Sequence, residues 1–101
     1  MVEVVRSGTF DRWFSQLKDQ RAVARVLVRI NRLAAGNPGD VKPVGQGVSE
    51  LRIAYGPGYR IYYLQDGDQV ILLLTGGDKS SQDADIRQAH QIAAEWRRGR
   101  P

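Results

Sequence analysis

The spacing of hydrophobic residues changes along this chain from helical to strand-like and back to helical. Residues 2–6 form a short apolar run that predicts a strand ending at Ser7. A helix with Thr9 as its N-cap should follow, because four large apolar residues recur at i, i+3, i+4 and i+7. These four residues are Phe10, Trp13, Phe14 and Leu17.

A second helix is predicted from about Gln20 to Ala35, ended by the Gly-Asn-Pro-Gly sequence at residues 36–39. Its expected apolar face consists of Val23, Leu27, Ile30, Leu33 and Ala34. So few residues separate the two helices that they should form an antiparallel hairpin.

The middle of the chain alternates apolar and polar residues, as half-buried strands do. The expected elements are a loop at 40–47 and strands at 49–55, 59–65 and 69–75, joined by turns at Gly56-Pro57-Gly58 and Asp66-Gly67-Asp68. The apolar run at 70–74 does not alternate, which is typical of a central strand covered on both faces.

A last helix should begin near Gln82 or Asp83, with the apolar face Ile86, Ala89, Ala93 and Trp96. The predicted order is β-α-α-β-β-β-α in one domain, residues 1–101, because a chain of this length supports one hydrophobic core. The fold class is therefore α+β: a helical hairpin packed on a small, mostly antiparallel sheet, with a C-terminal helix.

The amino-acid composition excludes several kinds of functional site and favours others. The chain has no cysteine and no metal-ligand or Ser/His/Asp pattern, so we expect neither a metal nor a cofactor. It shows no signal peptide and no membrane-spanning stretch, which predicts a cytoplasmic protein without membrane contact. The net charge is +4, and arginine supplies 12 of the 15 cationic residues. Arginine favours phosphate or carboxylate partners, although base composition or solubility would also explain the excess.

Arg52 and Arg60 flank the Gly-Pro-Gly turn, in strands that should pair with each other. If the register places both on one face, the two guanidiniums repel each other unless an anion lies between them. The other reading is a structural ion pair of one arginine with Glu50 or Asp78. The residues alone leave a phosphate site and a structural pair both open.

Lys79 follows the central strand directly after Gly76-Gly77 and Asp78. Glycines here would let backbone N–H groups approach a ligand closely, beside the N-terminus of the last helix. The GxxxxGK[ST] pattern of a nucleoside triphosphate loop is absent, so ATP binding is rejected and a smaller phosphate contact is retained.

Two further features could take part in binding or catalysis: a stripe of arginines and a single histidine. Arg21, Arg25, Arg29 and Arg32 form one basic stripe on the second helix, predicted to lie opposite its apolar face. This stripe is either a solvated face or a contact with an acidic partner or RNA backbone. His90, the only histidine, is either a general base or a packed structural residue.

Two stretches resemble a known family: ELRIAYGPGYRIYY and ILLLTGGDKSSQDADIRQA. They are similar to the RelE/ParE-like toxins of type II toxin–antitoxin modules, in the phage-derived addiction module killer branch that includes HigB-like toxins. The similarity extends over nearly the whole chain. It implies the RelE-like fold and a toxin that blocks translation by ribosome-dependent mRNA cleavage, in which a ribose 2′-OH attacks the adjacent phosphate without a metal.

The resemblance also implies roles for individual residues. Arg60 matches the phosphate-binding arginine and Arg52 is a supporting match, whereas Lys79 matches a basic residue for phosphate contact or leaving-group protonation. Tyr62 and Gln82 are expected to bind substrate beside them. RelE carries a tyrosine near the start of its last helix, and this chain has none there, so the resemblance assigns no general base.

The same fold admits other activities and implies certain partners. ParE-type members poison DNA gyrase, and an inactive relative could survive as an RNA- or partner-binding module. The expected partners are a cognate antitoxin, a small helix-turn-helix protein, and the ribosome with its mRNA. Operator DNA would be reached only indirectly, through the antitoxin.

Overall fold

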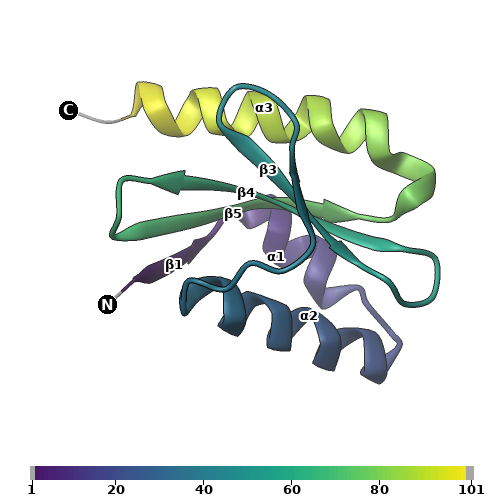
Figure 1. Ribbon diagram of the computed structural model, residues 1–101. Helices are drawn as coiled ribbons and strands as arrows, with labels where there is room; N and C mark the ends of the chain where they lie inside the picture. The colour runs from purple at the N-terminus through teal and green to yellow at the C-terminus, as the bar shows by residue number, and fades with distance from the viewer. Residues whose placement is uncertain (1, 100–101) are drawn as a thin grey trace.

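The computed structural model describes residues 2–99 and consists of a five-stranded sheet with helices on both faces (Figure 1). In chain order the elements are β1 (Glu3–Arg6), α1 (Gly8–Ser15), α2 (Gln20–Ala34), β2 (Val41–Pro43), β3 (Val48–Ile53), β4 (Tyr59–Asp66), β5 (Val70–Gly77), the 3₁₀ turn η1 (Lys79–Ser81) and α3 (Gln82–Arg98). The predicted α+β class and the C-terminal helix are confirmed.

The strands lie in the order β1-β5-β4-β3-β2. Only the β1–β5 pair is parallel, and the other three pairs are antiparallel. Helices α1 and α2 cover one face of the sheet, and α3 crosses the other (Figure 1). Strand β5 is central, as predicted: Ile71 and Leu73 belong to the core under α1 and α2, whereas Leu72 and Leu74 belong to the core under α3.

The predicted loop at 40–47 is wrong in part, because Val41–Pro43 pairs with β3 as the edge strand β2. A strand of three residues that ends in proline has almost no alternation to detect, and proline is tolerated at a sheet edge. The predicted N-cap Thr9 is also wrong. Helix α1 begins at Gly8, and Ser7 caps it by accepting a hydrogen bond from the Phe10 backbone N–H at 3.0 Å.

The buried face of α2 agrees with the predicted one at Ile30 and Leu33, whereas in the first half of the helix it lies one residue earlier. Ala22, Val26, Ile30 and Leu33 are its buried residues, whereas Leu27 is 42% exposed. Val26, Leu27 and Val28 are consecutive apolar residues, so periodicity alone does not identify the inward one. The arginine stripe therefore does not lie opposite the apolar face: each arginine stands one residue before a buried residue, so the stripe flanks that face.

Candidate active site

Three neighbouring strands bring the predicted arginines together on the face covered by α3. The register pairs Arg52 of β3 with Arg60 of β4, and pairs Arg60 with Gly77 of β5. Directly paired residues point to the same face of a sheet. The two arginines therefore do share one face, and Gly77 is the third position in their row.

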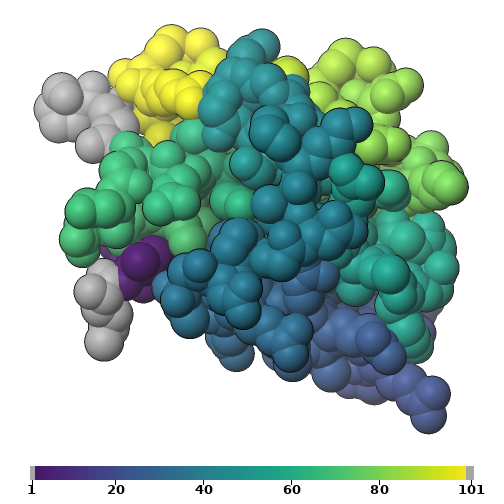
Figure 2. Space-filling model, viewed as in Figure 1, coloured from purple at the N-terminus to yellow at the C-terminus, as the bar shows by residue number. Residues whose placement is uncertain are grey.

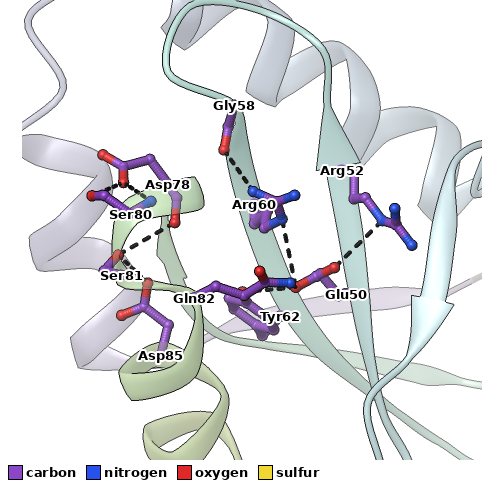
Figure 3. Close-up of polar contacts among 10 residues, drawn as sticks. All are labelled: Glu50, Arg52, Gly58, Arg60, Tyr62, Asp78, Ser80, Ser81, Gln82 and Asp85. Carbon is purple, nitrogen blue, oxygen red and sulfur yellow. Dashed lines mark hydrogen bonds and ion pairs between the residues drawn. The ribbon is translucent and has the colours of Figure 1, made fainter.

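A second row lies beside the first. Here Glu50 of β3 pairs with Tyr62 of β4, which pairs with Thr75 of β5. All three are buried, with exposures of 0%, 0% and 2%. The first turns of α3 cover this row, and Gln82 reaches into it (Figure 3). The site is thus built from paired strand positions and one helix end, all of them rigid elements.

Glu50 is the anion that lies between the two arginines. Its Oε1 is 3.4 Å from Arg52 Nε and its Oε2 is 3.6 Å from Arg60 Nε (Figure 3). Tyr62 Oη and Gln82 Nε2 donate hydrogen bonds to Oε2 at 2.9 and 2.8 Å. The structural pairing considered from the sequence is real, but one carboxylate serves both arginines, and Asp78 forms no ion pair within residues 2–99.

Both ion pairs to Glu50 leave buried polar atoms without a hydrogen bond within residues 2–99. Glu50 Oε1, Arg52 Nε and Arg60 Nε are buried and make no hydrogen bond to the described residues. One carboxylate charge faces two guanidinium charges, so the cluster retains a positive charge. Burial and the hydrogen bond to Glu50 raise the pKa of Tyr62 far above its ordinary value. This phenol therefore stays protonated as a donor and cannot act as a base at neutral pH.

Lys79 lies at the same end of the sheet. A Cβ placed on Gly58 would be 3.6 Å from Lys79 Cβ and 3.7 Å from Arg60 Nη1, so the turn after β3 brings these two cations close. Lys79 is exposed and makes no ion pair among the residues described. Asp78 caps η1 by accepting the Ser80 backbone N–H at 2.8 Å, and its bonds to Ser80 lower its pKa.

The role expected for Gly76 and Gly77 is wrong. Neither is an opening for ligand contact with the backbone, because side chains fill both spaces. A Cβ on Gly76 would lie 2.3 Å from Trp13 Cε3 on one face of the sheet, and a Cβ on Gly77 would lie 1.9 Å from Asp85 Oδ2 on the other. Asp85 thus lies beside the arginine row, a placement that the sequence did not predict, although two adjacent glycines in a central strand are a detectable signal.

The basic stripe on α2 has two kinds of arginine. Arg29 is structural: its guanidinium donates to the backbone carbonyls of Arg52, Pro38 and Asp40 at 2.6, 3.0 and 3.4 Å. Arg25 lies over the Tyr55 ring, 4.6 Å from its centroid. All four arginines line an open groove of about 570 Å³ beside the end of β3, together with Ala24, Val28, Ile53 and Ala54.

His90 lies away from the arginine cluster. Its Nε2 is 2.9 Å from the carbonyl oxygen of Val44, in the segment between β2 and β3. Arg97 donates to the neighbouring Gln46 carbonyl at 2.8 Å. In the space-filling view this segment runs across the front of the molecule to α3 (Figure 2). Of the two readings of His90, the structure favours the structural one.

Other kinds of site are not found in the part of the chain that the structure describes. No group of three or more histidine or carboxylate side chains could hold a metal ion over residues 2–99. None of the helices in that range is long and apolar enough to cross a membrane.

Comparison with known proteins identifies relatives over nearly the whole chain. A family model described as "Phage derived protein Gp49-like" matches residues 12–97. An uncharacterized protein of Haemophilus influenzae is 48% identical over 94 residues, which covers 93% of this chain and 95% of the relative.

Two solved structures share the fold. A chain of the toxin–antitoxin complex RelBE2 from Mycobacterium tuberculosis matches with a TM-score of 0.62 and 22% identity, over 77% of this chain and 98% of that one. The conserved hypothetical protein HP0894 from Helicobacter pylori matches with a TM-score of 0.51 and 22% identity, over 79% and 97% of the two chains. The expected RelE-like fold is confirmed.

Proposed function

This chain belongs to the phage-derived Gp49-like family, and we propose that it is the toxin of a type II toxin–antitoxin module that stops translation by cutting mRNA on the ribosome. The observation that carries the proposal is the cluster of Arg52, Arg60 and Lys79 at one end of a rigid sheet. Two arginines share one buried carboxylate, and Lys79 lies near them, so this end of the sheet keeps positive charge for a phosphate.

The cluster suits the charge that develops during RNA cleavage. Attack of the 2′-OH on the adjacent phosphate gives a phosphorane with extra negative charge, and preorganised cations stabilise that state. The Arg52 side chain is 37% exposed and that of Arg60 13%, so neither is closed off from solvent, while Glu50 faces the Nε atom of each. Lys79 is placed to contact the phosphate or to protonate the departing 5′-oxygen.

Tyr62 and Gln82 contribute through Glu50. Both donate to the same carboxylate oxygen, and Tyr62 is fully buried. We assign them to positioning: they hold the carboxylate that holds the arginines. A substrate phosphate would therefore meet a site whose cations are already oriented, and less conformational freedom would be lost on binding.

Replacing Arg60 with alanine tests the proposal. Cleavage of mRNA by the purified protein on programmed ribosomes should fall by at least ~100-fold, since removing one donor to a developing anion typically has that effect. Arg12→Ala is the matched control, because Arg12 is an exposed arginine of α1 whose side chain makes one hydrogen bond among the described residues, to nearby Thr9. It should cleave like the unchanged protein.

The same pair of variants, induced in cells, separates the competing functions. Codon-phased RNA ends that disappear in Arg60→Ala support the endonuclease. Growth arrest with DNA damage and intact mRNA would establish the gyrase-poisoning function instead. A protein that causes no arrest at all would be the inactive, partner-binding relative.

The groove beside α2 suits the cognate antitoxin. Its lining combines four arginines with the apolar residues Ala24, Val28 and Ala54, and Val28 is 46% exposed. An acidic segment with an apolar face would complement both properties, because opposite charges set the orientation and apolar contact excludes water. We therefore place a helix or extended segment of the antitoxin on this groove.

Reversing two groove charges tests this placement. Arg21 and Arg32 make no side-chain hydrogen bond or ion pair to the rest of residues 2–99, so the Arg21→Glu/Arg32→Glu variant should fold normally. We expect it to bind the cognate antitoxin at least ~10-fold more weakly, by titration calorimetry. Arg12→Glu/Arg98→Glu carries the same change of charge elsewhere, and equal weakening by both variants would contradict a specific groove.

A further inference from the structure

The third position in the row of Arg52 and Arg60 is filled by a carboxylate from helix α3. Arg52, Arg60 and Gly77 are paired across β3, β4 and β5, but Gly77 has no side chain to contribute. Asp85 Oδ2 from α3 occupies that space, only 1.9 Å from where a Cβ on Gly77 would lie. Adjacent same-face positions on paired strands are about 5 Å apart, so this carboxylate lies one strand away from the Arg60 position.

One side-chain hydrogen bond holds the Asp85 carboxylate, which can still accept others. Ser81 Oγ donates to its Oδ2 at 2.5 Å, and the carboxylate accepts no other side-chain hydrogen bond from residues 2–99 (Figure 3). It is partly buried, whereas Glu50 is fully buried with both oxygens facing arginines. Of these two carboxylates beside the arginine row, Asp85 is the one that a substrate can reach.

We propose that Asp85, seated over Gly77, is the general base that takes the proton from the attacking ribose 2′-OH. This assignment rests on the endonuclease function proposed above. The O2′–P bond forms as the hydroxyl proton passes to an Asp85 oxygen, and the P–O5′ bond breaks as O5′ receives a proton from the Lys79 ammonium. The products are a 2′,3′-cyclic phosphate and a free 5′-hydroxyl, and no further reactant is required.

The other candidate bases of the site are unsuited to this role. Tyr62 remains protonated because its pKa is raised by burial and by Glu50. Asp78 accepts both the backbone N–H and the hydroxyl of Ser80, and these bonds lower its pKa. His90 is directed to the Val44 carbonyl.

Burial is the main reason why Asp85 is a stronger base than an ordinary carboxylate. Burial raises its pKa, the Ser81 hydrogen bond lowers it, and the nearby Asp78 charge raises it. From β4, Arg60 and Tyr62 face the same space, and Glu50 of β3 lies beyond Gln82. The net effect is a raised pKa, which increases the affinity of this carboxylate for the proton of the 2′-OH.

The experiment compares pH–rate profiles of ribosome-dependent cleavage for the whole protein and three variants. For the unchanged protein the rate should rise with pH as Asp85 ionises. Asp85→Asn should cleave about 100-fold more slowly at neutral pH and should lack this rise. Asp83→Asn is the matched control, because Asp83 is an exposed carboxylate in the same first turn of α3, and it should keep both rate and profile.

The Ser81→Ala variant tests whether Asp85 acts in catalysis or only stabilises the fold. Ser81 makes no side-chain cap bond to α3, so its hydroxyl can be removed without uncapping the helix. Loss of its bond to Asp85 raises the pKa of that carboxyl, so the rising part of the profile should move to higher pH while the maximal rate is kept. A carboxylate with a purely structural role would not move the profile in this way.

The outcomes are distinguishable. A rising profile that moves in Ser81→Ala and vanishes in Asp85→Asn, with circular dichroism unchanged, supports the assignment. Cleavage by the unchanged protein with an identical profile in Asp85→Asn overturns it and leaves the endonuclease proposal standing. If the unchanged protein does not cut RNA at all, the proposed function fails, and the role of Asp85 fails with it.

Discussion

Replacing Glu50 with alanine is expected to lower the free energy of unfolding by about 3 kcal/mol, because removing one partner of a buried ion pair leaves the other charge uncompensated. Here two guanidiniums lose their counter-ion, and Tyr62 and Gln82 lose their acceptor. We take the lower end of the usual range, since Arg52 is 37% exposed and water will screen it. Urea denaturation followed by circular dichroism measures the change.

Two companion variants show whether charge or shape is responsible. Glu50→Gln keeps an oxygen that can accept from Tyr62 and Gln82, so it should lose only part of the stability while still releasing both arginines. Glu95→Ala removes an exposed carboxylate from α3 and should change the stability by no more than about 0.5 kcal/mol. A Glu50→Ala protein as stable as the unchanged one would mean that the two arginines find another counter-ion.

Replacing Gly76 with alanine is expected to cost a similar amount, about 3 kcal/mol, for a steric reason. The added Cβ would lie 2.3–2.5 Å from three atoms of the Trp13 ring. That ring cannot move away freely, because it also contacts Phe10 and Tyr59, with ring centroids 5.7 and 6.3 Å away. The midpoint of urea unfolding should therefore fall sharply.

A double-mutant cycle assigns the cost to this contact. In a Trp13→Leu background the ring is absent, so Gly76→Ala should cost much less than it does alone, and the two changes should be strongly non-additive. If Gly76→Ala costs the same in both backgrounds, the destabilisation arises in the strand itself and not from the packing of α1 on β5.

Each of the two adjacent glycines of β5 makes room for a side chain from a helix. Successive strand residues point to opposite faces, so Gly76 makes room for Trp13 of α1 on one face and Gly77 makes room for Asp85 of α3 on the other. The glycine pair thus sets how closely a helix approaches each side of the central strand. On the α3 side, that close approach places a carboxylate beside the arginine row.

The sequence by itself determined the local features of this protein. Helical spacing identified α1, α2 and α3, alternation identified β3 and β4, and Gly56-Pro57-Gly58 predicted the turn that joins these strands. Each of these signals depends on residues close in the chain, where sterics, turn conformation and hydrophobic period act directly. The resemblance then pointed to Arg60 and Arg52 as members of one site.

Only the tertiary structure decided how distant residues meet. The inward face of α2, the pairing of the short β2, and the ties from Arg29 to backbone carbonyls depend on packing between segments far apart in sequence. The same is true of the site itself. The β3–β4 register brought two arginines to one carboxylate, and an absent glycine side chain let Asp85 reach their row. Strand register depends on turn geometry and on which face becomes buried, and helix approach depends on the packed core, so neither follows from one local segment alone.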